Sequence, residues 1–273
     1  MRYSITSRFH GALLGATIAE KITNPSQSKP NAIAKLLIPG AQSLIELGRF
    51  ERQSWLKKLL ILELTPLQAV VATLPLALFY HDNKINLRSN LLSVASIWRH
   101  EPVIQESILA IGYAIAQALT EKLYPTKLIP QIVSFIDAPN TELTDALQQV
   151  QTLLEQKAGI EKTIIVKGSS VTTSVALAFY YFLSTVEDIN LSVKRSIQSP
   201  STSREIVGAL SGAYNSAANI PSSWQIVADS QTSPKAEMLQ LSEDLVAVWS
   251  GVYDSKAQLI STAVAAPRVI RSR

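Results

Sequence analysis

Two polar stretches hold the residues best suited to chemistry, and each precedes an apolar segment with helical spacing. They are Lys167, Gly168, Ser169 and Ser170 in the first stretch, and Ser199, Ser201, Thr202 and Arg204 in the second. Backbone amides at a helix start, together with hydroxyls and a cation, bind phosphate and other anions without a metal. Both stretches are therefore candidate anion sites, although an ordinary loop and helix start explains the first stretch as well.

Thr202 also has a purely structural explanation. In the run Thr-Ser-Arg-Glu from Thr202 to Glu205, the threonine fits the N-cap of a helix and the glutamate is placed to reach back to it. This capping box is sufficient to explain Thr202, because helix starts select such residues. We favour it over ligand binding at this position.

Helical periodicity dominates the chain, and no segment alternates apolar and polar residues convincingly as a strand would. Turn residues such as those at 24–25, 124–125 and 199–200 separate the helical segments. The predicted helices span residues 6–22, 31–48, 51–64, 66–81, 86–98, 102–122, 126–136, 141–157, 171–186, 188–197, 201–217 and 234–254. With no repeat and no linker, the sequence predicts one compact, multi-helix, all-α domain over residues 1–273, with a loosely attached basic tail at about 265–273.

Two of the predicted helices carry glycines four residues apart, Gly11 with Gly15 and Gly208 with Gly212. Residues at this spacing share one face of a helix. A glycine inside a helix costs about 1 kcal/mol relative to alanine, so four such positions indicate a close-packing requirement. We expect both helices to lie in the interior, where small faces let helix axes approach closely.

The amino-acid composition argues against several classes of function. Hydrophobic residues make up 47% and charged residues 17%, which indicates an unusually apolar globule or a surface for an unknown protein partner. The net charge of +4 is mostly scattered, whereas nucleic-acid proteins concentrate basic residues, so we expect no nucleic-acid partner. The absence of cysteine excludes disulfides and thiolate metal sites. No stretch qualifies as a membrane span or a secretory signal, so we expect no membrane association and a cytoplasmic location.

The two glycine segments resemble a known family. Residues 8–20, and residues 208–214 followed by Ile-Pro-Ser-Ser-Trp at 220–224, are similar to the first and last signature helices of the ADP-ribosylglycohydrolases. The resemblance implies a compact all-α fold in which Asp, Glu and Thr hold two magnesium ions. It also implies that the segment beginning at Gly168 borders an ADP-ribose pocket, and that His100 matches a histidine in a family turn.

The acidic ligands of the family are replaced in this chain. On the resemblance, Glu20 stands at an aspartate, Gln27 at a glutamate, and Ser199 and Ser201 at two further aspartates, while Thr202 keeps the family threonine. Neutral oxygens bind magnesium poorly without carboxylates. We therefore expect no metal and no magnesium cofactor here.

These losses favour a catalytically degenerate ADP-ribosylglycohydrolase-like protein that acts as a binding or interaction module rather than an enzyme. Its candidate ligand pocket comprises Glu20, Gln27, His100, Gly168, Ser169, Ser170, Ser199, Ser201, Thr202 and Arg204. This pocket permits ADP-ribose or a nucleotide as ligand. The alternative is an ADP-ribosyl glycohydrolase with a rearranged, weakly metal-dependent site that uses Glu20 and recruited acids. A third hypothesis, an unrelated all-α protein, expects that the two glycine helices do not cross.

Overall fold

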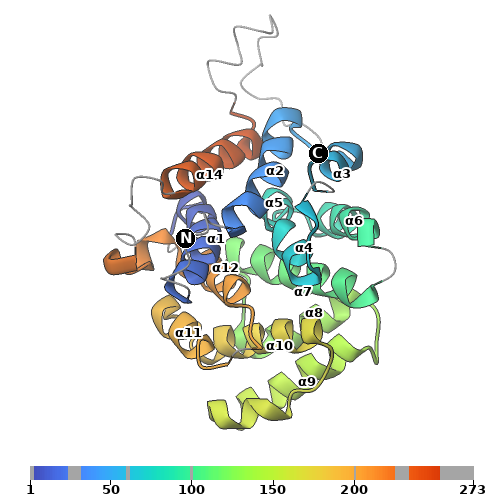
Figure 1. Cartoon of the computed structure of the whole chain (residues 1–273), viewed down its shortest axis with the longest axis vertical. Helices are drawn as coiled ribbons and strands as arrows, with labels where there is room; N and C mark the ends of the chain where they lie inside the picture. Colours follow the sequence, from blue (N-terminus) through green and yellow to red (C-terminus); the bar gives the residue numbers. More distant parts are fainter. Residues whose placement is uncertain are drawn as a thin grey trace, which may run out of the picture.

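The computed structural model describes residues 3–23, 32–59, 62–98, 101–199, 201–224 and 234–252, without the side chains of residues 164, 165 and 234. Within these ranges all regular structure is helical. Figure 1 shows α2 to α6 on one side of α7, and α8 to α10 on the other. The predicted all-α, multi-helix fold is confirmed. The predicted basic tail at about 265–273 lies outside the described residues.

The helices follow the predicted order. They are α1 (Ile5–Thr23), α2 (Ala32–Leu47), α3 (Arg52–Leu59), α4 (Pro66–Ala72), α5 (Leu74–Phe79), α6 (Lys84–Ala95), α7 (Pro102–Leu119), α8 (Pro125–Ile136), α9 (Glu142–Glu155), α10 (Ser170–Ser184), α11 (Ile189–Ser196), α12 (Arg204–Asn215) and α14 (Pro234–Ser250), with 3-10 helices η2 (Ser96–Trp98), η3 (Ile160–Ile165) and η4 (Ala217–Asn219). The helix predicted over 66–81 is in fact two, α4 and α5, which divide at Thr73. Pro75 explains the division, because a proline inside a helix removes one hydrogen bond and clashes with the preceding turn.

Helix α7 is the central element of the core. It packs against helices from both sides, including α5, α6, α8, α10 and α12. It is the one described helix whose length and mean hydropathy, 1.2, would suffice to cross a membrane, and 78% of it is buried within the fold. The prediction that no stretch has this composition was therefore wrong. The burial explains why, since a helix surrounded by other helices is apolar on every side.

Helices α1 and α12 cross in direct backbone contact. A β-carbon on Gly15 would overlap the carbonyl oxygen of Gly208, and a β-carbon on Gly11 would overlap that of Gly212. The overlaps are mutual, since β-carbons on the two α12 glycines would meet the α1 carbonyls. Because Gly11 faces Gly212 and Gly15 faces Gly208, the two helices are antiparallel. The predicted close-packing role of these glycines is confirmed, and the third hypothesis is wrong in expecting no crossing.

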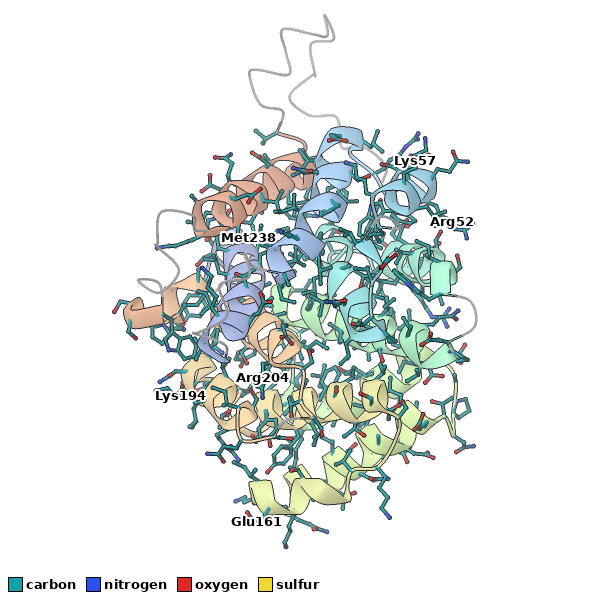
Figure 2. All side chains as sticks on the ribbon, in the orientation of Figure 1. Arg52, Lys57, Glu161, Lys194, Arg204 and Met238 are labelled. Carbon is teal, nitrogen blue, oxygen red and sulfur yellow. The ribbon has the colours of Figure 1, made fainter. Side chains whose placement is uncertain are left out.

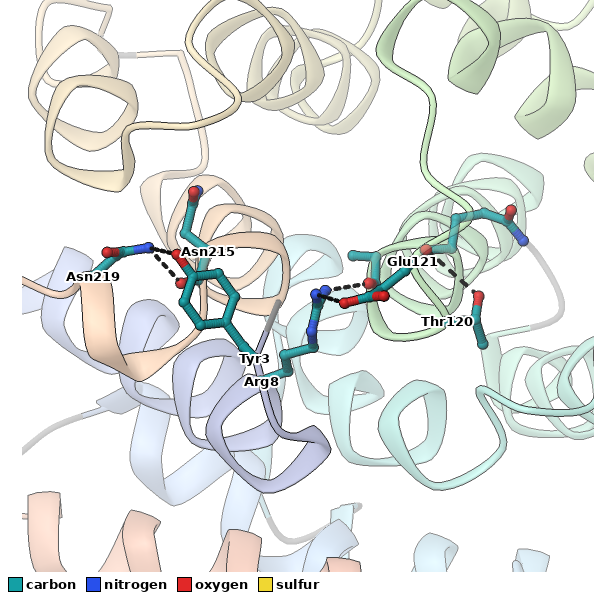
Figure 3. Close-up of polar contacts among 8 residues, drawn as sticks. Tyr3, Arg8, Thr120, Glu121, Asn215 and Asn219 are labelled. Carbon is teal, nitrogen blue, oxygen red and sulfur yellow. Dashed lines mark hydrogen bonds and ion pairs between the residues drawn. The ribbon is translucent and has the colours of Figure 1, made fainter. Parts of the chain in front are cut away.

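A half-buried ion pair joins α1 to the end of α7 (Figure 3). Arg8 is 4% exposed and donates hydrogen bonds of 2.6 Å to the Glu121 carboxylate and to the Ala118 carbonyl. The last carbonyls of a helix have no partner within it, so Arg8 satisfies one of them. Close by, Asn219 donates to the Tyr3 hydroxyl at 2.7 Å, which joins the N-terminal segment to η4. These contacts hold the N-terminal part of α1 against α7 and η4.

The glycine crossing generates a prediction about stability. We expect Gly15→Ala to lower the free energy of unfolding by about 3 kcal/mol, because the methyl group would overlap a backbone carbonyl that cannot rotate away. Gly112→Ala in α7 is the matched control, since there the methyl group would meet the flexible Leu91 side chain. Urea denaturation of both variants measures the difference, and equal losses would contradict the role assigned to the crossing.

Candidate functional site

The segment before α12 differs from the predicted capping box. Helix α12 begins at Arg204, and Ser203 is its N-cap residue, without a side-chain cap hydrogen bond. The Thr202 amide instead donates to the Ser199 carbonyl at 3.1 Å, so Thr202 belongs to the preceding turn. The Ser203 hydroxyl donates to the Glu205 carboxylate at 2.9 Å. The prediction of Thr202 as N-cap was therefore wrong, because the helix starts one residue later.

The Thr202 hydroxyl makes no hydrogen bond within the described part of the chain. Thr202 is 5% exposed, and its hydroxyl oxygen is buried with no hydrogen-bond partner among the described residues. The Arg204 Nε is also buried and has no hydrogen-bond partner among the described residues. Arg204 is labelled at the start of α12 in Figure 2. A buried polar group without a partner costs about 1–3 kcal/mol. Such a group calls for an explanation, and one explanation is that a ligand or a water molecule binds there.

Glu20 lies at the C-terminal end of α1, the helix that crosses α12. Its carboxylate accepts a hydrogen bond of 3.2 Å from the Ile33 amide, at the start of α2. Partial burial raises the pKa of Glu20, and the neighbouring Glu205 carboxylate raises it further, against the opposing effect of the hydrogen bond from Ile33. Glu20 is thus used as a cap for α2. It is held near Glu205 because α1 and α12 run antiparallel.

These residues form what we call the helix-end site, where α1 ends and where α2 and α12 begin. It comprises Glu20, Ser199, Ser201, Thr202, Ser203, Arg204 and Glu205. Its acids are the two glutamates, and no group of three or more His, Asp or Glu residues suited to a metal ion occurs in the described part of the chain. Two magnesium ions require several hard anionic oxygens in octahedral arrangement. The residues described at the helix-end site do not fit a two-magnesium centre.

In the stretch before α10, amides at the helix start have hydrogen-bond acceptors within the protein. Ser169 is the N-cap of α10, and its hydroxyl accepts a hydrogen bond of 3.3 Å from the Thr172 amide. The Ser169 amide donates to the carboxylate of Glu142, at the start of α9. An anion supplied by the protein therefore already occupies the amide that a phosphate would need. Ser170 begins α10, and both Gly168 and Ser170 are exposed.

A hydrogen bond brings α10 and the helix-end site together. The Ser174 hydroxyl donates to the Ser201 carbonyl at 2.6 Å. Ser170 and Ser174 are four residues apart and share one face of α10. The predicted candidates at 168–170 and 199–204 therefore lie on neighbouring elements. Gln27 and His100 lie outside the described residues, so their predicted place in the pocket stays a prediction.

Sequence reasoning left Glu205, Ser203 and Glu142 out of the candidate set. The two glycine pairs contained a signal for the first two. If Gly11 faces Gly212 and Gly15 faces Gly208, the same antiparallel register brings Ala19 and Glu20 next to the start of α12. The contact of Ala19 with Gly208, where an added β-carbon would lie 2.9 Å from the Ala19 methyl group, agrees with this register. No comparable pattern pointed to Glu142.

Two surface cavities lie elsewhere on the molecule. One of about 460 Å³ is bounded by residues of α6, α7 and α8, and another of about 390 Å³ lies between α2 and α14. Neither cavity is lined by a candidate residue. The helix-end site therefore presents its polar groups where helix ends meet, apart from both cavities.

Comparison with known proteins identifies the family. The family model described as ADP-ribosylglycohydrolase matches residues 57–255, which is most of the chain. The chain belongs to the ADP-ribosylglycohydrolase family. The match begins after α1 and α2, so Glu20 lies outside the matched residues, while Thr202 and Arg204 lie within them. This membership confirms the resemblance and excludes the unrelated all-α protein.

A solved structure shares the ADP-ribosylglycohydrolase fold. It is described as "ADP-ribosylglycohydrolase-related protein complex" and aligns with a TM-score of 0.63 at 16% sequence identity. The alignment covers 90% of this chain and 99% of that one. At this identity the likeness supports the fold alone. No curated protein matches the chain.

The position of Glu20 generates a prediction about pH dependence. The pKa of Glu20 in the folded protein lies above its ordinary value of 4.5, chiefly because burial disfavours the charged form. Its contribution to stability is therefore fully present below pH 4.5 and is lost as the pH rises through the folded-state pKa. We expect Glu20→Gln to match the wild type at low pH and to be more stable at pH 7, by less than about 1 kcal/mol because solvent screens the partly exposed carboxylate.

Thermal and urea unfolding between pH 4 and pH 8 measure this difference. Glu101→Gln changes an exposed carboxylate in the same way and serves as the matched control. A Glu20→Gln protein that is less stable than the wild type at pH 7 would contradict the prediction, and it would mean that the charge on Glu20 supports the start of α2.

Proposed function

We propose that this ADP-ribosylglycohydrolase family member has lost the hydrolytic reaction and acts as a binding module for ADP-ribose or a related nucleotide. The observation that carries the proposal is the use of Glu20. It is the one acid that the sequence left at the expected site, and its carboxylate accepts a hydrogen bond from the Ile33 amide as a cap for α2.

The chemistry of the donor set argues against metal-assisted hydrolysis. Ser199, Ser201 and Thr202 supply neutral oxygens, which leaves the charge on Glu20 and Glu205. Glu205 accepts a hydrogen bond from the Ser203 hydroxyl, and Glu20 accepts one from the Ile33 amide. Magnesium is held in proteins through carboxylates and phosphates in a near-ideal octahedron. We therefore assign no catalytic step and no metal ligand to these residues.

The groups that remain suit an anionic ligand. The buried Thr202 hydroxyl and the Arg204 Nε have no partner among the described residues, and both stand at the N-terminus of α12. The positive end of a helix dipole and an arginine side chain each favour a phosphate group. A ligand with a pyrophosphate, such as ADP-ribose, would satisfy these groups without a metal.

The alternative remains a hydrolase with a rearranged, weakly metal-dependent site. The pair formed by Glu20 and Glu205 favours it, because a carboxylic acid with a raised pKa next to a second carboxylate suits general acid catalysis. Both residues would have to release their present hydrogen bonds in order to take part. We prefer binding for this reason.

A protein partner and a cytoplasmic location stay part of the proposal. The large hydrophobic side chains that are exposed come from several elements of the described chain. They are Leu47, Ile85, Tyr124, Leu191, Ile197 and Val252. Single exposed apolar residues are normal on soluble proteins and mark no interface. Any partner must therefore be sought by experiment.

The ligand is tested by calorimetric titration with ADP-ribose, with and without magnesium. We expect binding of equal strength in both conditions, because the proposed contacts are the helix start, Thr202 and Arg204. Arg204→Gln should weaken binding about tenfold or more, since a hydrogen bond to a charged group is worth about 1.5–3 kcal/mol. Lys194→Gln removes one exposed charge from neighbouring α11 and is the matched control. Binding that requires magnesium would contradict the proposal.

Thr202→Val separates binding from folding. The variant keeps the shape of the side chain and removes the unpartnered hydroxyl, so the free energy of unfolding should stay the same or rise by about 1 kcal/mol. The affinity for ADP-ribose should fall in the same variant. A loss of stability with unchanged affinity would show that the hydroxyl serves the fold alone.

The enzyme alternative has its own test. Purified protein is assayed for release of ADP-ribose from an ADP-ribosylated protein, with magnesium and with manganese. We expect no turnover above background in either condition. Robust turnover that is abolished by Glu20→Ala would establish the hydrolase and overturn the proposed loss of catalysis.

A further inference from the structure

The cavity between α6, α7 and α8 has the features of a second ligand site, distinct from the helix-end site. Its volume of about 460 Å³ falls in the range of small-molecule pockets. The residues that give it polar character are Lys84 on α6, Tyr113 on α7, and Thr126, Lys127, Gln131 and Ser134 on α8. No acidic residue lines it. Its charge therefore comes from two lysines.

Neither lysine is neutralised by the described protein. The described residues supply no ion pair to Lys84 or to Lys127. The Lys84 ammonium instead lies 5.6 Å from the ring centroid of Tyr113 and 5.7 Å from that of Phe135, two rings that pack 4.7 Å apart. Contacts of this kind place an ammonium group without cancelling its charge. Lys84 thus stays available to an anion in the cavity.

Tyr113 supplies a hydroxyl group at the same cavity. The residue is 5% exposed and lines the cavity, and its hydroxyl has no hydrogen bond to any residue that the structure describes. The Gln131 side-chain oxygen is also buried without a partner in the described chain. Buried polar atoms are nearly always hydrogen-bonded, so the Gln131 oxygen calls for a partner, and the Tyr113 hydroxyl beside the same cavity is free to bind one as well.

The spacing on α8 adds further polar groups on one side. Lys127, Gln131 and Ser134 follow one another by four and three residues, which puts them on a single face of the helix. Together with Lys84 and Tyr113, this face offers two cations, hydroxyl donors and an amide. Phosphate oxygens accept from ammonium and hydroxyl groups, while a hydroxyl or amine of an organic portion donates to the glutamine oxygen.

We propose that this cavity binds a small molecule that carries a phosphate group, with Lys84, Lys127 and Tyr113 on the phosphate and Gln131 on the organic portion. The site does not depend on the function proposed for the helix-end site. The two share no residue and come from different helices.

The test is an NMR titration of the full ¹⁵N-labelled chain with sodium phosphate and with AMP, at constant ionic strength. We expect the amides of α8 to shift and saturate with both probes, and AMP to bind more tightly than inorganic phosphate. Lys84→Gln and Tyr113→Phe should each weaken binding about fivefold or more, a factor typical of one lost hydrogen bond. Tyr113→Phe keeps the ring that packs against Phe135, so a loss of binding in this variant cannot come from a loss of packing.

Two controls separate this site from the rest of the molecule. Lys35→Gln removes the same charge from the exposed face of α2 and should leave both affinities unchanged. Arg204→Gln should likewise leave the shifts in α8 unchanged, even if it abolishes a response at the start of α12. Shifts that grow linearly without saturation, or affinities that are unchanged in both cavity variants, would overturn the proposal. If AMP binds no more tightly than inorganic phosphate, the assignment of Gln131 to the organic portion of the ligand is wrong.

Discussion

The backbone contact between α1 and α12 is the constraint on which the candidate site depends. The glycines at the crossing allow the carbonyls of one helix to touch the α-carbons of the other, and any larger side chain would force the axes apart. The crossing is antiparallel, so the end of α1 and the start of α12 must lie together. The Arg8 contacts with Glu121 and Ala118 then fix this pair against the central helix α7.

This geometry makes the fold independent of the residues that stand at the helix ends. The crossing is made by backbone atoms and requires only the absence of side chains, so it does not depend on the residues at the helix ends. Those ends still need hydrogen-bond partners, because the first amides of a helix have none within it. Glu20 meets this need for α2 and Glu142 meets it at the start of α10. These carboxylates therefore serve as hydrogen-bond acceptors for the helix starts around the helix-end site.

Much of this arrangement could be predicted from the sequence, and the failures have definite physical causes. The helices and the glycine crossing follow from local periodicity and from the cost of glycine in a helix. The start of α12 could not be placed, because Thr202 and Ser203 are both acceptable N-caps and the turn at Ser199 decides between them. The capping roles of Glu20 and Glu142 depend on contacts between helices distant in sequence, which local patterns do not contain.

Thr202 gives the strongest reason to look for a ligand at the helix ends rather than to regard the site as vestigial. Its capping role is excluded, and its hydroxyl is buried with no partner among the described residues. A valine would fill the same space without the cost of a buried, unsatisfied hydroxyl. Local choices that work against folding concentrate at functional sites, where a ligand compensates for them. Thr202 and Arg204 keep the groups that an anion requires, and the proposed binding role rests on them.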